Sequence, residues 1–498
     1  MTTRLPRRAR AAHRRPAVGA VLAALVLVMT VAACDGSPPP PENPPYWHPG
    51  TVVTATNHGP LVRIKWSATT GGDPVGSYQI TLGSYTGTVV ALVPASVRDC
   101  YITGLAANTS YSIVVTARDA QQHWSGPLPG TQGNRTTAIT TTGHGGSGNL
   151  WCHAPTDTDD DGVPNALETN DGTYTSASDV GTDPANPDTD NDGIPDGEEA
   201  LGIAGLNLRT MGAKPTHKDL FVELDWLDDL ACPGGHRPGP NAIALLVDAF
   251  ADAPILNPDG TTGIRVFADY GQGGAFTGGN VIPDADGRLD NSTGVNSAQF
   301  LATKGTHTDP ARLGVFQYGL VGLGTPIAEG WGNDFRAGDG CGDNDTISFA
   351  GTVMHEIGHN LSLEHGGATP YVTRKPNYSS VMTYDYQRDG LDTDCDRWGD
   401  ETVIGYSSGT NPTLDETDLD ETVGLCNGVD IDWNYDGVIE TSVAYDVNQD
   451  GDVNEFYGGA VWGPLKDHND WALVDSRGLR CVRARPDLDP PRCPNSLD

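Results

Sequence analysis

The chain has 498 residues, with 65 Asp and Glu against 30 Lys and Arg, and a formal net charge of −35 at pH 7. That length allows about three domains, and the acidity argues against nucleic-acid binding, because a polyanion needs a basic surface on its partner. Much of the charge is concentrated, since residues 156–199 hold 14 acidic groups and residues 413–455 hold 13, with no Lys or Arg in either block. Like charges repel, so these two blocks are expected to bind something cationic.

Residues 1–33 have the pattern of an export signal, in which several arginines precede an apolar run that is too short to span a membrane. The string VAAC, which ends at Cys34, resembles the lipobox of bacterial lipoproteins. That resemblance implies cleavage before Cys34 and a lipid anchor on it; ordinary cleavage after Ala33 is the alternative. The Pro-rich residues 34–48 are expected to form an extended tether. We therefore expect a bacterial protein exported to the cell surface as a lipoprotein or released outside the cell.

Export also affects the cysteines, because the compartments it leads to are oxidising. Of the nine Cys residues, eight remain if Cys34 carries lipid, and they can form up to four disulfide bonds. Their pairing cannot be deduced from the sequence.

Residues 49–142 are predicted to form a β-domain. Short alternating runs bounded by Gly, Asn and Asp are the expected strands: Leu61–Trp66, Ser77–Leu82 and Ser110–Ala117. The spacing of Leu105, Thr109 and Tyr111, together with Trp66, resembles a fibronectin type III module, and another β-sandwich is the alternative. Such modules are mostly spacers or binding surfaces.

A Gly/Ser linker (143–150) leads into residues 151–212, which contain two calcium-loop patterns with carboxylates at positions 1, 3, 5 and 12 and Gly at position 6. The expected ligands are Asp157, Asp159, Asp161 and Glu168 in the first loop and Asp188, Asp190, Asp192 and Glu199 in the second. Calcium takes six to eight oxygens, so carboxylates must converge from alternate positions of a sharply turned loop. The segment resembles bacterial thrombospondin type 3 repeats, which implies a calcium-filled spacer; a solvated acidic run is the alternative. Pro164 and Pro195 argue against the flanking helices of an EF-hand.

Residues 213–425 are predicted to form an α+β catalytic domain. The strands are expected at 218–226, 263–270 and 312–324, with a helix at 241–253. Residues 355–365 then read HEIGHNLSLEH. If the preceding segment is helical, His355 and His359 lie one turn apart on one face and can bind one metal ion, with His365 adding a third nitrogen after the helix ends. Glu356 lies beside them, placed to take a proton from metal-bound water. A structural helix that carries this string by accident is the alternative.

Met382 follows His365 by 17 residues, and this combination resembles the metzincin clan of zinc metallopeptidases. The resemblance implies three zinc-binding histidines, Glu356 as the general base and Met382 as the residue of the Met-turn. It implies a catalytic role for Tyr384, as a zinc ligand or at the oxyanion; a packed structural tyrosine is the alternative. Ser362 stands where the family has a Gly in a left-handed turn, a departure that costs on the order of 1 kcal/mol.

Residues 426–498 contain the second acidic block, where the loop opening occurs twice more. The expected calcium ligands are Asp432, Asn434 and Asp436, then Asp446, Asn448 and Asp450. Position 12 is Val443 in one loop and Tyr457 in the other, so the closing carboxylate is missing; Glu440 and Asn454, at position 9, are candidates to replace it. The pattern also resembles a dockerin, but the spacing is too short for the helix of that module, and we do not expect cohesin binding.

The sequence therefore predicts a multidomain protein with a β-sandwich module, calcium-loop repeats and an α+β metzincin-like catalytic domain. The expected function is that of an exported, lipid-anchored zinc endopeptidase, stabilised by calcium, that hydrolyses peptide bonds by zinc-activated water with Glu356 as the general base. Its partners would be a protein or peptide substrate and the membrane. The alternative is a calcium-dependent surface binding or adhesion protein with an inactive peptidase fold. The sequence does not indicate an oligomeric state.

Overall fold

The computed structural model describes residues 43–479 with gaps. Outside it lie 1–42, 49–52, 59–60, 85–86, 107, 122, 124–133, 141–149, 203–205, 229–235, 284–294, 296–297, 324–325, 329–331, 339–345, 370–371, 400–401, 426–428, 455, 458–459, 462 and 480–498. The expected export signal, Cys34 and nearly all of the 143–150 linker therefore fall outside the described residues. Within the described part of the chain, no helix has the length and apolar character needed to cross a bilayer.

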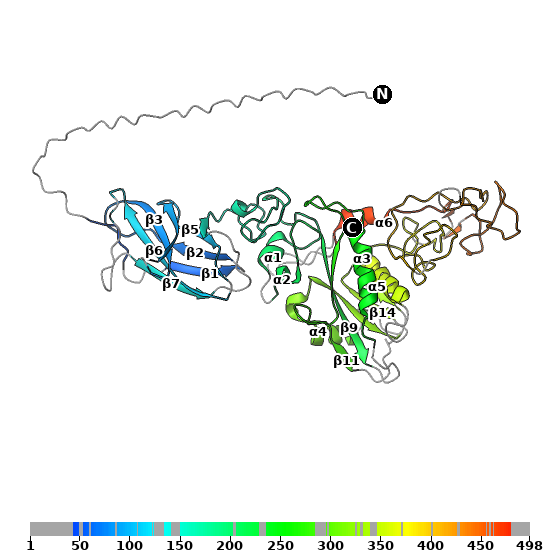
Figure 1. Ribbon diagram of the computed structural model, residues 1–498, viewed down its shortest axis with the longest axis horizontal. Coiled ribbons are helices and arrows are strands. Elements are labelled where there is room, and N and C mark those ends of the chain that lie inside the picture. Colours follow the sequence, from blue (N-terminus) through cyan, green and yellow to red (C-terminus); the bar gives the residue numbers. More distant parts are fainter. Residues whose placement is uncertain are drawn as a thin grey trace, which may run out of the picture. The chain divides into compact units, whose positions relative to one another are not determined.

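The first folded part is a β-sandwich of two antiparallel sheets (Figure 1). One sheet has the order β1 (Val53–His58), β2 (Leu61–Trp66), β5 (Asp99–Thr103) and β8 (Trp151–His153). The other has the order β4 (Thr88–Pro94), β3 (Val75–Leu82), β6 (Ser110–Asp119) and β7 (Asn134–Thr140). All three predicted strands are present, and the prediction of a β-sandwich is confirmed.

The sandwich core forms because alternate residues of both sheets face inward. Ile64 of one sheet and Ile80 of the other are fully buried in one cluster. Trp66 is buried there too, with its ring edge-on to that of Tyr78 at 5.6 Å between centroids. The Tyr111 hydroxyl accepts a hydrogen bond of 2.9 Å from the backbone amide of Ala106, which ties down the corner that leads into β6.

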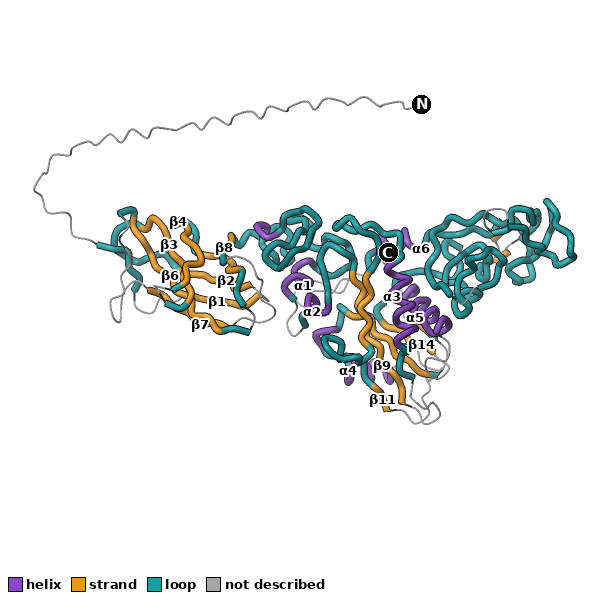
Figure 2. The backbone as a smooth tube through the Cα atoms, in the orientation of Figure 1, coloured by secondary structure: helices purple, strands orange, loops and turns teal. Residues whose placement is uncertain are grey.

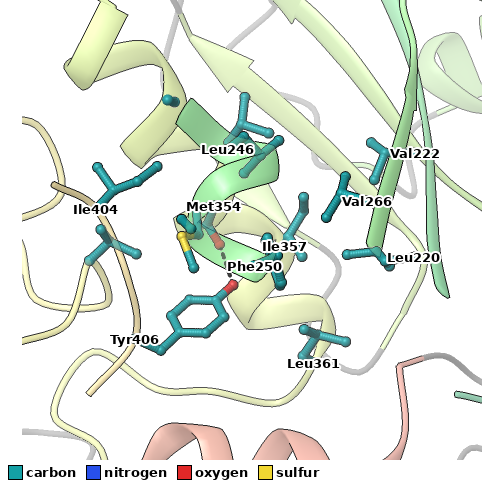
Figure 3. Close-up of a cluster of buried hydrophobic side chains, with 14 of the residues drawn as sticks. Leu220, Val222, Leu246, Phe250, Val266, Met354, Ile357, Leu361, Ile404 and Tyr406 are labelled. Carbon is teal, nitrogen blue, oxygen red and sulfur yellow. Dashed lines mark hydrogen bonds between the residues drawn. The ribbon is translucent and has the colours of Figure 1, made fainter. Parts of the chain in front are cut away.

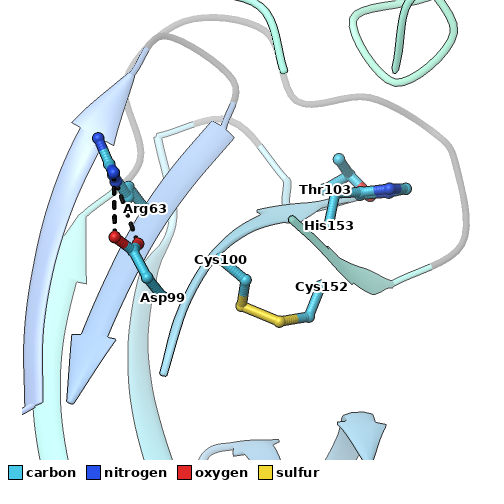
Figure 4. The surroundings of a disulfide bond; sticks show 6 residues. All are labelled: Arg63, Asp99, Cys100, Thr103, Cys152 and His153. Atoms are coloured by element: carbon cyan, nitrogen blue, oxygen red, sulfur yellow. Dashed lines mark hydrogen bonds and ion pairs between the residues drawn. A yellow bond between two sulfur atoms is a disulfide. The ribbon is translucent and has the colours of Figure 1, made fainter. Parts of the chain in front are cut away.

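A disulfide bond between Cys100 and Cys152 joins β5 to β8 (Figure 4). Beside it, Asp99 accepts two hydrogen bonds from the Arg63 guanidinium, at 3.1 and 3.0 Å. The bond closes a chain segment with a sequence separation of 52. Closing a loop of that size reduces the entropy of the unfolded chain by an amount equivalent to about 4 kcal/mol. It therefore fastens the start of the calcium-loop segment to the sandwich.

The segment of residues 151–212, where calcium loops are predicted, is mostly irregular (Figure 2). Its described helices are short: η1 (Asn165–Leu167), α1 (Asp196–Leu201) and α2 (Leu208–Met211). Pro164 and Pro195 are the N-cap residues of η1 and α1. A proline cannot continue a helix from its N-terminal side, so the long helices of an EF-hand do not precede these positions.

The next part is built on a sheet with the order β10-β9-β12-β14-β13, in which β11 also pairs with β9. The strands are β9 (Asp219–Asp228), β10 (Arg265–Asp269), β11 (Val281–Pro283), β12 (Phe316–Gly322), β13 (Ile327–Ala328) and β14 (Asp334–Gly338). All pairs are parallel except the antiparallel edge strand β13. The helices are α3 (Pro240–Ala251), α4 (Ala298–His307), η2 (Pro310–Arg312) and α5 (Thr346–Asn360). The predicted α/β alternation is confirmed for the three strands and the helix between the first two.

Helices α3 and α5 share one hydrophobic core with this sheet (Figure 3). Figure 3 also shows the Tyr406 hydroxyl donating to the Met354 carbonyl of α5, at 2.6 Å. Gly351 and Gly358 lie two turns apart on α5. A Cβ on Gly351 would come within 2.1 Å of the Gln387 carbonyl oxygen, and one on Gly358 within 2.3 Å of the Met382 sulfur. The two glycines therefore allow the chain after α5 to pack directly on the helix backbone.

The C-terminal part contains β15 (Phe456–Tyr457), β16 (Ala460–Val461) and α6 (Asp470–Arg477). The acidic block folds around a small core of its own that includes Leu419, Trp433 and Val447. The chain then returns to the main core, where Trp471 and Val474 of α6 are buried in the same cluster as α3 and α5.

Candidate metal centre

Three histidines converge at the C-terminal end of α5. His355 and His359 lie on the helix, and the chain then turns to bring His365 against them. Their Nε2 atoms are 3.1 Å apart for His355 and His359, 3.2 Å for His355 and His365, and 2.9 Å for His359 and His365. A tetrahedral zinc ion with Zn–N distances of 2.0–2.1 Å requires N–N separations of about 3.3 Å. The donor set therefore fits one zinc ion.

The turn between the helix and His365 has a defined form. Ser362 has a φ of 72°, in the left-handed region, as the sequence comparison with the metzincin pattern predicted. Its amide donates to the His359 carbonyl at 2.9 Å, and the amide of Leu363 donates to the Gly358 carbonyl at 2.8 Å. These two bonds form a Schellman motif, which ends the helix and satisfies its last carbonyls. This strained backbone conformation at Ser362 lets the chain turn so that His365 approaches the other two histidines.

The outer nitrogen of each imidazole lies against an oxygen atom. The Nδ1 contacts are Val381 O at 2.7 Å for His355, Leu363 O at 3.0 Å for His359, and Tyr384 Oη at 3.3 Å for His365. A carbonyl can only accept, so Nδ1 of the first two rings carries the proton and Nε2 presents its lone pair inward. Burial lowers the pKa of all three histidines, and that of His365 falls to about 4, helped by its neighbour His359. Neutral imidazoles that face one point can bind a metal ion without first losing a proton.

Glu356 is nearly completely buried beside these rings, and its Oε2 has no hydrogen-bond partner. Burial raises the pKa of its carboxyl to about 8, while the positive charge of Arg336 acts in the opposite direction. An unpartnered buried oxygen is costly unless a ligand or water completes its bonding. The carboxyl is therefore suited to accept a proton from a water molecule at the histidine cluster.

The two remaining predicted residues also lie at this cluster. Met382 is fully buried in the turn below the histidines, and its amide donates to the Ser380 hydroxyl at 3.2 Å. Tyr384 is about half exposed, and its ring centroid is 4.5 Å from that of His365. Its hydroxyl lies at the outer nitrogen of His365. All six residues that the sequence predicted for this site are thus brought together by the fold.

The first of the predicted calcium loops has its carboxylates clustered as expected, and Asp196 joins them. Carboxylate oxygens of Asp157, Asp159 and Asp161 lie within 4.8 Å of one another, and so do those of Asp161, Glu168 and Asp196. Asp159 has two buried oxygens without a hydrogen-bond partner, and Asp161 and Glu168 have one each. Burial raises the pKa of Asp161 to about 7 and that of Glu168 to about 8. Buried acids without donors are the environment that a cation stabilises.

The second loop is more deeply buried. Asp188, Asp190 and Asp192 form another carboxylate group within 4.8 Å. Glu199 is fully buried, and neither of its oxygens has a hydrogen-bond partner. Burial and the neighbouring carboxylates raise the pKa of Asp190 and of Glu199 well above the ordinary range. The unpartnered oxygens of Asp190 and Glu199 lie near other carboxylates, and a cation would supply the positive charge that they lack.

The third and fourth loops have the same backbone form but are largely exposed. Asp432 and Asp446 each accept hydrogen bonds from the amides at loop positions 5 and 6. Glu440, the predicted replacement for the closing ligand, is exposed in the third loop, and a carboxylate from outside the loop holds its backbone. Glu421, fully buried, accepts bonds of 2.7 Å from the Trp433 amide and 2.9 Å from the Glu440 amide.

Glu416 has the corresponding place in the fourth loop, where it accepts bonds of 2.6 Å from the Val447 amide and 3.2 Å from the Asn448 amide. Both glutamates come from outside the loops that they hold. The sequence pattern missed them because nothing in the spacing of a loop motif shows which distant carboxylate closes it. They lie in the same acidic block, which is the one signal that could have suggested them.

A further acidic group that the sequence analysis missed is Asp392, Asp394 and Asp396, whose oxygens lie within 4.8 Å of one another. Asp392 accepts hydrogen bonds from the amides of Asp396 and Arg397, as the first residue of the other loops does. The D-x-D-x-D spacing was visible in the sequence. Position 6 of this group holds Arg397 instead of the usual Gly, with a φ of 77°.

Comparison with protein-family models gives no match, and no curated protein matches the chain. Among solved structures, the spore cortex lytic enzyme SleM of Clostridium perfringens is similar at 16% identity over 20% of this chain and 29% of that chain, with a TM-score of 0.16. The structure titled FN3tt mut has 24% identity over 20% and 98%, with a TM-score of 0.16. The fn3 domain of human collagen alpha-1(XX) chain has 19% identity over 22% and 95%, with a TM-score of 0.16. We draw no function from likenesses this weak.

Proposed function

We propose that this protein is a zinc-dependent endopeptidase of the metzincin type. The observation that carries the proposal is the convergence of three Nε2 atoms, 2.9–3.2 Å apart, beside the unpartnered oxygen of Glu356. A structural helix with an accidental motif has no reason to bring the Nε2 atom of a third histidine to the same point. We also propose that residues 49–142 are a fibronectin type III module and that residues 151–212 are thrombospondin type 3 repeats.

Each residue then has a role in peptide hydrolysis. His355, His359 and His365 would hold the metal, which supplies a Lewis acid that polarises a carbonyl and lowers the pKa of water. Glu356 accepts a proton from the attacking water and returns it to the leaving amine. The carbonyl contacts at Val381 and Leu363 keep two imidazoles in the required tautomer and orientation.

Tyr384 has two possible contributions. Its hydroxyl supports His365 through Nδ1, and its half-exposed ring covers the outer side of the site. A movement of this side chain toward a bound substrate would bring a donor to the oxyanion. The substrate class is a protein or peptide, and the calcium loops stabilise the exported chain in the millimolar calcium outside a cell. Anchoring through lipid on Cys34 is part of the proposal.

The decisive experiment compares the wild type with Glu356→Gln, which keeps the shape of the side chain. We expect both proteins to bind one zinc ion, measured by metal analysis, and only the wild type to cleave an unfolded protein substrate. The loss should be at least 10²-fold, the usual contribution of a general base. A wild type that binds zinc and cleaves no peptide in a broad library would instead support the surface-binding alternative, and a wild type without zinc would overturn the metal site.

A further inference from the structure

The first residue of α6 supports the turn beneath the histidines. The fully buried carboxylate of Asp470 accepts hydrogen bonds of 2.8 and 2.9 Å from the Tyr378 hydroxyl and of 2.7 Å from the Ser380 hydroxyl. The Ser380 hydroxyl in turn accepts the amide of Met382 at 3.2 Å. The next carbonyl in this turn, that of Val381, is the one that orients His355. A carboxylate from the C-terminal helix therefore fixes both the Met-turn and one ligand.

The segment just before α6 supports the third histidine. The buried Lys375 ammonium donates to the carbonyl of Gly366 at 2.7 Å and to that of Lys466 at 2.8 Å. A Cβ on Gly367 would come within 2.5 Å of the His468 side chain, so the two segments are in direct contact. The chain immediately after His365 thus rests on residues 466–468. Together with Asp470, residues at and just before the N-terminal end of α6 therefore support the turn that orients His355 and the chain that follows His365.

The other end of α6 is bonded to the second calcium loop. The Asn191 side-chain amide donates to the Asp475 carbonyl at 3.1 Å, and the Leu479 amide donates to the Asp192 carbonyl at 3.2 Å. Lys218 adds a contact of 3.5 Å to the Asp475 carboxylate. Asn191 and Asp192 are positions 4 and 5 of the loop, so any movement of the predicted ligands also moves their backbone. The eight residues of α6 span about 12 Å between the two ends.

We propose that calcium in the loop Asp188–Glu199 and zinc at the histidine cluster are coupled through α6, with Asp470 as the positioning residue at the zinc end. Without calcium, one oxygen of Asp190 and both oxygens of Glu199 are buried without a hydrogen-bond partner. Neighbouring carboxylates repel them, so the loop relaxes to separate the charges or to admit water. That relaxation releases the C-terminal end of α6, and the Met-turn loses its fixed support. Because coupling of binding equilibria is reciprocal, zinc also strengthens calcium binding.

The inference rests on the proposed zinc site and is tested with the full-length chain stripped of both metals. Zinc affinity is measured by competition with a chromogenic chelator, with and without saturating calcium chloride. We expect calcium to raise the zinc affinity at least fivefold, the low end of ordinary allosteric coupling. The absorption spectrum of the cobalt-substituted protein, which reports ligand geometry, should shift with calcium as well.

Two variants test the route. Asn191→Gly removes the side chain that donates to the Asp475 carbonyl, and Gly tolerates the φ of 59° at this position. This variant should still bind calcium, but calcium should no longer raise its zinc affinity to the same extent. Gln449→Gly makes the same change at position 4 of the fourth loop, where φ is 58°, and should keep the full effect. Asp470→Asn should weaken zinc binding about tenfold, as loss of an outer support does, with a changed cobalt spectrum.

Zinc affinity independent of calcium in an active wild-type enzyme would overturn the coupling and leave the peptidase proposal intact. An unchanged calcium effect in both Asn191→Gly and Asp470→Asn would overturn the route through α6. A wild type that binds no zinc would refute the peptidase proposal itself.

Discussion

The close packing of α5 on the Met-turn makes Gly358→Ala the most direct test of the site's architecture. The new methyl group would lie 2.3 Å from the Met382 sulfur and 3.2 Å from the Tyr406 ring. Ordinary contacts begin near 3.5 Å, so the sulfur must move by about 1 Å. Met382 is fully buried, and Tyr406 is held by its bond to Met354. Neither neighbour can move without displacing the turn that carries Val381 and hence His355.

Overpacking of this kind costs about 1–3 kcal/mol, which corresponds to about five- to a hundred-fold in an equilibrium constant. Alanine also gains about 0.5–1 kcal/mol over glycine inside a helix, and this gain must be measured separately. Gly305 of α4 is the matched control, because a Cβ there meets nothing within 4 Å. Gly305→Ala should therefore raise stability slightly, while Gly358→Ala lowers it.

The assay combines thermal unfolding with chelator competition for zinc in both variants and the wild type. We expect Gly358→Ala to lose zinc affinity as well as stability, since the displaced Met-turn carries the contact to His355. Equal unfolding temperatures and equal zinc affinities in the two alanine variants would show that α5 does not rest on Met382, and the description of the site would fail.

Three further outcomes are expected. Ser362→Gly should raise the free energy of unfolding by about 0.5–1 kcal/mol in urea titration, because φ is 72° and glycine relieves the strain; a decrease would contradict this. Replacing Cys100 and Cys152 by serine should lower the free energy of unfolding of the sandwich by about 4 kcal/mol in calorimetry, because the disulfide closes a loop with a sequence separation of 52. A loss below about 1 kcal/mol would contradict this. Burial raises the pKa of Asp161 to about 7 and of Glu168 to about 8, so calcium-free stability should fall as pH rises from about 4 through 8. The gain in melting temperature on adding calcium should therefore grow between pH 5 and 8, and a constant gain would count against buried, unneutralised acids.

Local chemistry explains why so much of the site could be predicted from the sequence. Two histidines four residues apart share a helix face in any α-helix, and Asp at alternate positions before a Gly forms the same turned loop in any context. The strand Leu61–Trp66 was visible because buried and more exposed residues alternate along most of its length. The left-handed conformation of Ser362 was expected because the metzincin pattern that the sequence resembles has a Gly in a left-handed turn at this position.

Contacts between distant segments could not be predicted in this way. Asp470 lies 90 residues from Ser380, Glu421 lies 12 residues from Trp433, and neither forms a motif with its partner. The sequence also separated the C-terminal acidic block from the catalytic part, whereas the structure returns α6 to the core beside α3 and α5.

The sequence by itself determined which side chains can hold cations in this protein and in what local order they stand. Only the tertiary structure decided which of those sites are joined. The reason is physical. A metal-binding loop or helix is specified by backbone torsions and residue spacing over about a dozen positions. The groups that support it come from distant parts of the chain, and tertiary packing decides which of them lie close enough to form hydrogen bonds. Here packing brought one short helix between the second calcium loop and the histidine cluster, and nothing in the spacing of either motif contains that fact.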